Sequence, residues 1–492
     1  MKKIVYLVKV FLCIIGFIAL AVLSRTKNKI ENNMEEELPD AVILIDEIDK
    51  DINIHKQKIR VLIKNTDYQS IYHEQVLLSS DTDYTLSFNN GEQEQFCRYK
   101  AGEEVLIKPD CDFFYGHKVV VAPQVQTGKI ILKNVHRNQG CPAYSGCIEL
   151  FEDVGGIIAI NEVDLEEYLY SVVPSEMPSS YPKEALCAQA VCARTYAYRH
   201  ILQASYPRYE AHVDDSTSFQ VYNNIPEQES TTDAVNETRG LLLYAPDGEP
   251  AATFYYSTSC GFGSDETVWK TNETMNGNYL HSKRLCNYDA IDGKLMMDEE
   301  AFQTYIMQVN ENDFEKDCGW YRWNYRVEHL NMQHIYDILC ERYNENETLV
   351  LTKKEKNYIS EIPQKFKCLK DIYIAARGPG GVADELVIET DNNTYKIISE
   401  HNIRYVLNSG ENQVKLQDGK LIECKELLPS GFFILQTRKE KENVVGYSLI
   451  GGGFGHGAGM SQNCAKQMAV EGYSYEQILQ FFFENCTIEQ CK

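Results

Sequence analysis

The spacing of apolar positions changes several times along the chain, and each change marks a different kind of element. Residues 4–23 form an apolar run that only Lys9 interrupts. About 20 helical residues cross roughly 30 Å of hydrocarbon, so we favour an uncleaved transmembrane helix over residues 1–24. A signal peptide cleaved near Ala19-Leu20-Ala21 is the alternative. Under either interpretation the rest of the chain is expected to act outside the cytoplasmic membrane, on the cell-wall side.

The next two segments differ from this run and from each other. Residues 25–57 are acidic and have no regular apolar period, which is typical of a solvated tether. Residues 58–160 contain short alternating or β-branched runs, each bounded by Gly, Asn, Asp or Pro. This pattern predicts a β-rich N-terminal part.

Residues 161–284 change to a helical period and form a predicted helical core. One face of the first helix is expected to carry Leu165, Tyr168, Leu169 and Val172. Pro174 should end this helix within a residue or two, which leaves SEMPSSYP as a loop. Pro182 is then expected as the first residue of an alanine-rich helix.

The remaining chain returns to β structure before it closes with helices. Residues 237–260 predict a strand pair that turns at Pro246-Asp247-Gly248. Residues 285–369 are mixed, charged and interpreted as an insertion, and residues 370–492 form a β-rich part. It ends in two helices, 461–470 and 475–483, the second with a capping box. The fold class is therefore α+β, with β-rich segments around a helical catalytic element that one N-terminal transmembrane helix precedes.

Charge and cysteine content exclude some classes of function. The chain has 72 acidic and 48 basic residues and a formal net charge of −24, which excludes nucleic acid as the main partner because such binding needs clustered basic residues. None of the 16 cysteines forms a C-x-x-C pair, so a zinc ribbon is not expected. Cys141 and Cys147 could form a short disulfide loop, whereas Cys187 and Cys192 point apart on one helix.

Glu176 is the strongest candidate for chemistry. It lies in VVPSEMP, between two predicted helices and among apolar residues. Apolar surroundings disfavour the charged carboxylate and raise its pKa towards neutrality, as a general acid requires. A surface glutamate that caps a turn is the alternative.

Three other segments carry weaker signals. In GGGFGHGAGMSQ, residues 451–462, glycines alternate with larger residues, and at strand period this leaves one bare face for close approach of a ligand or another segment. Asp214 and Asp215 lie in DDSTS, where turn chemistry is the default. Cys260 and His456 could form a nucleophile–base pair, but no local feature lowers the thiol pKa.

Taken together, five ordered segments resemble one family. They are LEEYLYSVVPSEMPSSYPKEALCAQAVCARTYAYRH, DSTSFQVY, TRGLLLY, FYYSTSCGFG and GGGFGHGAGMSQNCAKQMAVEGYSYEQIL. The chain resembles the stage II sporulation protein D and LytB amidase-enhancer family of bacterial cell-wall proteins. The likeness spans about residues 165–480.

The resemblance implies a peptidoglycan lytic transglycosylase that acts on glycan strands without stem peptides, in cell-wall remodelling or sporulation. Glu176 would protonate the oxygen between N-acetylmuramic acid and N-acetylglucosamine. It would then take the proton of the C6 hydroxyl as the 1,6-anhydro ring closes. One carboxylate serves both steps, and Glu176 is the only acid that we find in an apolar motif.

The resemblance also implies a groove around Glu176 and a set of partners. The residues expected to line this groove are Arg194, Gln220, Tyr222, Ser257, Ser259, His456 and Gln462. The resemblance also implies that some sporulation members bind zinc through His and Cys just before the Q-x-Y motif. Those positions hold residues such as Val213, Ser218 and Phe219 here, so we expect no metal and no cofactor. A Cys260–Cys464 disulfide could form beside the groove.

Two further functions stay open. The chain is long and has the extra 285–369 segment, which resembles the amidase-enhancer branch. A non-catalytic protein that binds glycan and enhances an N-acetylmuramoyl-L-alanine amidase is therefore the main alternative. A Cys peptidase that uses Cys260 is the third.

Overall fold

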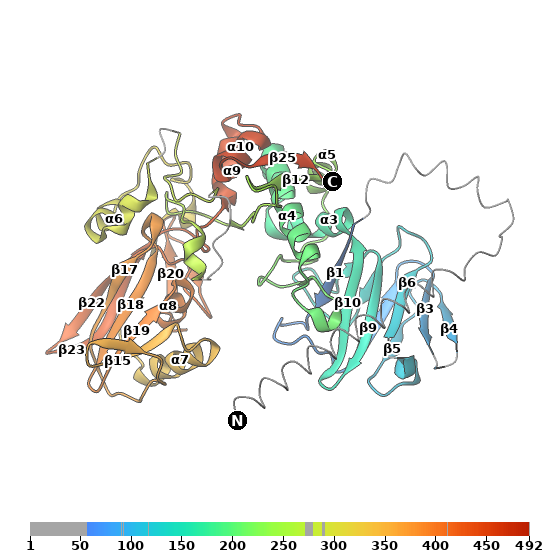
Figure 1. Cartoon of the computed structure of the whole chain (residues 1–492), viewed down its shortest axis with the longest axis horizontal. Helices are drawn as coiled ribbons and strands as arrows, with labels where there is room; N and C mark the ends of the chain where they lie inside the picture. The colour runs from blue at the N-terminus through green and yellow to red at the C-terminus, as the bar shows by residue number, and fades with distance from the viewer. Residues whose placement is uncertain are drawn as a thin grey trace, which may run out of the picture. The chain divides into compact units, whose positions relative to one another are not determined.

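The computed structural model describes residues 57–491 except 90, 92, 117, 271–278, 288–290 and 411 (Figure 1). The expected anchor, residues 1–24, and all but the last residue of the expected tether lie outside the described residues. Within the described part, no helix is long and apolar enough to cross a membrane. The part shown is α+β, as expected, with several sheets and eight α-helices among the described residues.

Two antiparallel-rich sheets make up the N-terminal β-rich part. The first has the order β11-β1-β10-β9-β6-β3-β4 and the second β5-β2-β7-β8. The strands of the first are β1 Lys58–Ile63, β3 Tyr84–Asn89, β4 Glu94–Tyr99, β6 Lys118–Pro123, β9 Cys147–Asp153, β10 Gly156–Asp164 and β11 Val213–Asp214. Those of the second are β2 Val76–Ser80, β5 Val105–Ile107, β7 Ile130–Leu132 and β8 Ala143–Tyr144.

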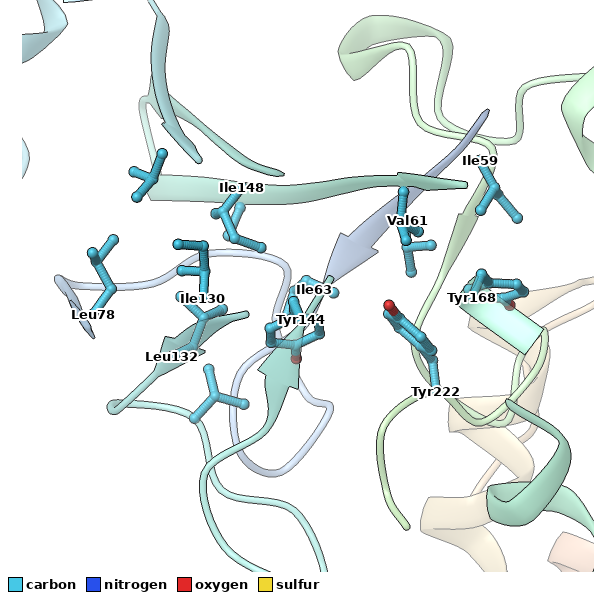
Figure 2. Packing of buried hydrophobic residues seen from close by; sticks show 14 of the residues in the cluster. Ile59, Val61, Ile63, Leu78, Ile130, Leu132, Tyr144, Ile148, Tyr168 and Tyr222 are labelled. Atoms are coloured by element: carbon cyan, nitrogen blue, oxygen red, sulfur yellow. The ribbon is translucent and has the colours of Figure 1, made fainter. Parts of the chain in front are cut away.

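One hydrophobic cluster lies between these strands and the first helix. Alternate residues of β1 enter it because successive side chains of a strand point to opposite faces. Figure 2 shows Leu78, Ile130 and Leu132 on one side of the cluster and Tyr168 and Tyr222 on the other. The β-rich part therefore provides the packed surface that holds the start of the helical core.

Helix α3 spans Leu165–Glu176 and buries the face that the sequence predicts. Asp164 caps it by accepting a hydrogen bond from the Glu166 N–H at 3.0 Å. Pro174 lies inside the helix, and α3 continues for two residues beyond it, with the Met177 N–H bonded to the Val173 carbonyl at 2.9 Å. The predicted end of the helix within two residues of Pro174 is confirmed, but the loop begins at Met177 and not at Ser175. Proline removes only its own N–H, so the turn after it can still close, and Glu176 is the last helical residue.

Helix α4, Lys183–Leu202, begins one residue later than predicted, because Pro182 is its N-cap. Its small buried alanines allow α5 (Glu229–Glu237), α9 (Gln462–Val470) and α10 (Tyr475–Phe482) to pack close by. The two C-terminal helices and the capping box of Ser474 and Gln477 are confirmed. Figure 1 shows α9 and α10 beside α4, although the sequence places them far apart.

The predicted strand pair of residues 237–260 is only partly correct. The turn forms, since the Ala245 N–H bonds to the Glu249 carbonyl and the Ala251 N–H to the Leu243 carbonyl. However, β12 (Leu241–Tyr244) forms its ladder with β25 (Thr487–Gln490), and β13 (Tyr255–Tyr256) pairs in parallel with β24 (Met460–Ser461). Both partners come from the C-terminal end of the chain, beyond the range of a local turn signal.

A ten-stranded sheet dominates the remainder, in the order β16-β15-β19-β18-β17-β23-β14-β20-β21 with β22 paired to β23. Its strands are β14 Trp323–Val327, β15 Val350–Lys354, β16 Asn357–Ile359, β17 Leu369–Arg377, β18 Ala383–Thr390, β19 Thr394–Ile398, β20 Gln413–Leu416, β21 Leu421–Glu423, β22 Phe433–Glu440 and β23 Asn443–Gly451. The other helices are α6 Glu299–Ile306, α7 Met332–Glu345 and α8 Glu400–Val406. Strands from both sides of residue 369 thus share one sheet.

The glycine run after β23 is not an extended strand, which corrects the strand-period interpretation. Gly453, Gly455, Gly457 and Gly459 all have positive φ, a region that other residues rarely adopt. The close approach that we expected does occur, because a Cβ at Gly459 would collide with the Phe254 carbonyl oxygen. Glycine therefore lets this segment lie directly against the residues around β13.

Candidate functional site

The Glu176 carboxyl lies at the C-terminal end of α3 and receives two hydrogen bonds. The Val221 N–H donates to Oε1 at 2.6 Å, and the Tyr255 hydroxyl bonds to the same carboxyl. Burial raises the pKa of Glu176 to about 7, although both hydrogen bonds lower it. The predicted rise towards neutrality is confirmed, so this carboxyl can both hold and release a proton near neutral pH.

Gln220 fixes the Tyr255 hydroxyl. Its Nε2 donates to the Tyr255 oxygen at 3.0 Å and to the Ala193 carbonyl at 3.2 Å, while its Oε1 accepts from the Tyr168 hydroxyl at 3.3 Å. Because the Tyr255 oxygen already accepts a hydrogen bond, its own proton is directed to Glu176. Gln220 is fully buried and acts through Tyr255.

His456 supports the backbone of the same tyrosine. Its Nε2 lies 3.1 Å from the Tyr255 carbonyl oxygen and its Nδ1 accepts from the Ala458 N–H at 3.2 Å, which assigns the proton to Nε2. Burial, together with the charge of Arg404, lowers the pKa of His456 to about 4. His456 is therefore neutral at physiological pH and positions Tyr255 without exchanging protons.

Gln462 reaches α3 from the C-terminal part of the chain. As the first residue of α9, it donates from Nε2 to the backbone carbonyl of Glu176 at 3.1 Å and to Gln189 Oε1 at 3.4 Å. This bond satisfies one of the carbonyls that every helix end leaves open. Of the residues expected around Glu176, the structure thus brings Gln220, His456 and Gln462 to it or to its direct partner.

Half-buried aromatic rings form a wall beside these residues, which we define as Tyr196, Phe254, Trp269 and His456. The Phe254 ring centroid lies 4.2 Å from that of Trp269 and 6.2 Å from that of Tyr196, and Trp269 lies 5.2 Å from His456. Tyr196 links the wall to the acid, because burial and the nearby Glu176 carboxylate both raise the pKa of the Tyr196 phenol.

Arg194 does not take the expected position. It is almost fully buried and forms a two-pronged ion pair with Glu166, with both nitrogen–oxygen distances at 2.8 Å. Its remaining donors bond to Thr238 Oγ1, the Leu241 carbonyl and the Val235 carbonyl. These contacts saturate the guanidinium, so we assign Arg194 a structural role in place of the substrate-binding role.

The other expected residues have protein partners as well. The Tyr222 hydroxyl donates to Asn161 Oδ1 at 2.8 Å within the hydrophobic cluster. The Ser257 carbonyl accepts from the Asn463 N–H at 3.0 Å, and the Ser259 hydroxyl donates to Glu315. Tyr222 and Ser259 are buried and do not present a surface to a ligand.

Two residues of this site escaped the sequence analysis. Tyr255 lies in a tyrosine-rich segment in which no feature distinguishes it from its neighbours. Glu315 lies in the segment interpreted as an insertion. Burial raises the pKa of Glu315 to about 7, as it does for Glu176. Glu176 is thus not the only carboxyl whose pKa is raised by burial, although Glu315 lies in the polar run NDFEKD and no local motif around it could have revealed its contacts.

The cysteine interpretations find no geometric support. Cys260 is buried, its pKa is raised to about 11 by that burial, and its Sγ lies 3.8 Å from the Phe262 carbonyl oxygen. His456 bonds elsewhere, so it does not pair with Cys260. Cys141, Cys147, Cys260 and Cys464 are free thiols, so neither suggested disulfide is present.

The DDSTS segment has the turn chemistry predicted for it. Asp214 Oδ1 accepts from the Ser216 N–H at 2.8 Å, and buried Asp215 pairs with Arg137 at 2.6 Å. Among the residues that the structure describes, no group of three or more His, Cys, Asp or Glu side chains is arranged to hold a metal ion.

Comparison with known proteins places these residues in two matched regions. Residues 153–244 match the family described as Stage II sporulation protein (SpoIID), and residues 265–459 match a Domain of unknown function (DUF8618). Glu176 and Gln220 fall in the first region and His456 in the second, while Tyr255 and Gln462 lie outside both.

Two relatives from Bacillus subtilis (strain 168) align with the chain. The Amidase enhancer is 25% identical over 326 residues, which cover 65% of this chain and 40% of that protein. Stage II sporulation protein D is 36% identical over 128 residues, which cover 23% of this chain and 36% of that protein. The chain thus spans well under two thirds of either relative. The SpoIID match over residues 153–244 and these relatives confirm the predicted resemblance to the stage II sporulation protein D and LytB amidase-enhancer family.

Proposed function

We propose that this protein is a peptidoglycan lytic transglycosylase that cleaves the bond between N-acetylmuramic acid and N-acetylglucosamine in strands without stem peptides. The observation that carries the proposal is the half-buried Glu176 carboxyl, whose pKa of about 7 and two hydrogen-bond donors suit one group that acts as acid and then as base. The SpoIID match of residues 153–244 and the similarity to the Amidase enhancer support a role at the cell wall.

In this mechanism the protonated Glu176 carboxyl donates its proton to the glycosidic oxygen as the bond to the muramic C1 breaks. The Val221 N–H and the Tyr255 hydroxyl stabilise the carboxylate that remains. The carboxylate then takes the proton of the muramic C6 hydroxyl, whose oxygen bonds to C1 and closes the 1,6-anhydro ring. Glu176 ends protonated, no water is consumed and no second carboxylate is needed.

The aromatic wall supports a carbohydrate substrate. Sugar rings have apolar C–H faces that pack on aromatic rings, and the wall adjoins the reacting carboxyl. We also propose that the helix expected over residues 1–24 anchors the chain, with residue 25 onward on the cell-wall side. Susceptibility of the ectodomain to protease added to intact protoplasts would test this placement.

The direct test incubates residues 30–492 with glycan strands that an amidase has stripped of peptides, followed by mass analysis. Wild type should release products with anhydro-muramic ends, and Glu176→Gln should not, because the amide holds no transferable proton. Asp265→Asn, which changes an acid outside the described contacts of Glu176, is the matched control and should cleave like wild type. Intact strands after incubation with wild type would contradict the proposal.

A non-catalytic amidase enhancer is the second candidate, since the match to the Amidase enhancer covers 65% of the chain. In that case wild type and Glu176→Gln would leave glycan strands intact, sediment with them equally and stimulate an N-acetylmuramoyl-L-alanine amidase to the same extent. The two candidates therefore differ in whether any effect depends on the Glu176 carboxyl.

A further inference from the structure

Glu315 contacts two segments of the chain, one at Ser259 and one at Ser461. These segments also carry Tyr255 and Gln462, which bond to Glu176. Its carboxyl accepts hydrogen bonds from the Ser259 hydroxyl, from the Ser259 N–H at 3.1 Å and from the Ser461 hydroxyl at 2.8 Å. Ser259 follows Tyr255 by four residues, and Ser461 directly precedes Gln462. One side chain thus holds the segment of the tyrosine that bonds the Glu176 carboxyl and the segment of the glutamine that bonds its backbone.

These two segments are already neighbours. β13 and β24 pair in parallel, with Tyr255 opposite Met460 and Tyr256 opposite Ser461. The ladder is only two residues long, which is too short to fix an alignment by itself. Asn463 adds bonds to the Ser257 carbonyl and to Thr258 Oγ1 at 2.9 Å. Glu315 adds a further link by accepting hydrogen bonds from Ser259 on one segment and from Ser461 on the other.

The Ser461 hydroxyl bonds to Glu315 and not to a backbone N–H of α9. Ser461 occupies the N-cap position of α9, where a serine side chain normally accepts from a helix N–H. Here it makes no such bond and donates to Glu315 instead. The start of α9, and with it Gln462, is therefore held by the carboxyl from another segment.

Among the residues that the structure describes, no cation pairs with the Glu315 carboxyl. Glu315 is almost fully buried, and none of the ion pairs among the described residues includes it. The groups that face it are the Asp313 carboxyl, the Tyr181 and Tyr256 phenols, and the Cys318 and Cys464 thiols. Burial of such an acid is costly unless hydrogen bonds compensate, so its three donors are an essential part of the arrangement.

The segment that carries Glu315 is itself held rigidly. Two residues earlier, Asp313 accepts from Arg284 at 2.8 Å, from the Tyr321 hydroxyl at 2.6 Å and from the Tyr305 hydroxyl. These bonds tie residues 313–315 to α6, to the segment before it and to the approach to β14. The position of Glu315 is therefore set by the region outside the SpoIID match.

We propose that Glu315 is a positioning residue for Glu176: by holding Ser259 and Ser461 together, it aligns the Tyr255 hydroxyl and the Gln462 amide on the end of α3. It does not touch the substrate or the reacting carboxyl. Its effect on cleavage rests on the proposed function, but its effect on the geometry around Glu176 does not. The second matched region would thus supply part of the support for the acid of the first.

Glu315→Gln tests this in the full-length protein. Glutamine keeps the size but offers one acceptor and a donor that opposes the Ser259 N–H. Infrared difference spectra across pH follow the C=O band of the protonated Glu176 carboxyl, which is identified by its loss in Glu176→Gln. We expect this band to titrate about 0.5–1 pH unit higher in Glu315→Gln, because the Tyr255 hydrogen bond that lowers the pKa is weakened. Removal of a negative charge alone would move the titration lower or leave it in place.

The kinetic measurement is separate. On stripped glycan strands, Glu315→Gln should lower kcat about 10- to 100-fold, while the fraction of protein that sediments with glycan stays as in wild type. If wild type releases no anhydro ends, the proposed function fails, and the infrared titration still decides the positioning role. An unchanged Glu176 titration or a shift to lower pH would overturn that role.

Ser461→Ala provides a milder second variant, which removes one donor and keeps the buried carboxyl. It should shift the Glu176 titration in the same direction by a smaller amount. Should Glu315→Gln fail to fold, as judged by its thermal unfolding, Ser461→Ala decides: an upward shift supports the proposal, and an unshifted band overturns it.

Discussion

Glu176 combines burial with two hydrogen-bond donors, and this combination sets the pH range in which it can act. Below pH 7 most of the carboxyl groups hold the proton that a general acid must donate. We expect kcat for stripped glycan to fall as pH rises through about 7, approaching tenfold per unit above it. Rates measured from pH 5 to 9 test this. A profile that stays flat from pH 6 to 9 would contradict the assignment.

Arg194 and Glu166 illustrate a residue pair whose importance is structural. Removing one member of a buried pair leaves the other charge without compensation, so Arg194→Met should lower the free energy of unfolding by about 3–5 kcal/mol. Arg208→Met is the control, because the Arg208 guanidinium is exposed where it pairs with Asp153, and its loss should cost about 0–1 kcal/mol. Urea unfolding compares the two, and equal losses would contradict the structural role.

Among the elements, the junction of β13 with the glycine run depends on Gly459. Its φ is +80°, and a Cβ there would meet the Phe254 carbonyl oxygen. Gly459→Ala should therefore displace β24 from β13, lower stability by more than about 1–3 kcal/mol and reduce glycan cleavage. Gly472→Ala is matched in positive φ, at +93°, but has open space around it and should keep its activity. Thermal unfolding and cleavage assays on both variants distinguish the two effects. Gly472→Ala reports backbone strain alone, and Gly459→Ala adds the collision with Phe254.

The aromatic wall should contribute to binding more than to chemistry. Trp269→Ala removes its largest ring, and we expect glycan affinity to fall about 3- to 10-fold, equivalent to about 0.5–1.5 kcal/mol. Trp269→Phe keeps a flat apolar face and should retain most of the affinity. Sedimentation with stripped glycan across protein concentrations measures both. Equal binding by wild type and Trp269→Ala would show that the aromatic wall is not part of the glycan-binding surface.

Local signals explain which elements the sequence could predict. The helices α3, α9 and α10 show periodic apolar positions or a capping box, α4 shows a proline before an alanine-rich run, and all four form. Glu176 could be selected because its apolar neighbours are adjacent in sequence. Tyr255, Glu315 and the β12–β25 ladder could not, because their partners lie dozens to hundreds of positions away. The ion pair that buries Arg194 likewise depends on how α3 and α4 cross.

For the whole molecule, buried acids give folding a pH dependence of defined sign. Glu176 and Glu315 have pKa values raised to about 7, and Asp215 to about 6, so the folded chain binds protons more tightly than the unfolded chain between about pH 4.5 and 7. Stability from these groups is greatest at the lower limit of this window and is lost as pH rises through it.

The Glu176 contribution can be isolated. One pKa unit corresponds to about 1.4 kcal/mol, so the rise in the Glu176 pKa from 4.5 to about 7 amounts to at most about 3.5 kcal/mol. Glu176→Gln has no charge to bury and should exceed wild type in unfolding free energy at pH 8 by more than at pH 5. Urea unfolding at the two pH values tests this. A constant difference would show that the carboxyl titrates equally in both states.

The bond between Gln462 and Glu176 spans 286 positions of the chain. At about 5–20 residues per second, a ribosome adds Gln462 roughly 15–60 s after Glu176. During that interval the nascent polypeptide carries Glu176, Val221 and Tyr255 but lacks Gln462, and β12 has not yet paired with β25. Prematurely terminated copies would stay in this unassembled condition. Under the proposed function, a copy that stops before Gln462 would carry the acid of a cell-wall enzyme without the glutamine that supports the end of its helix.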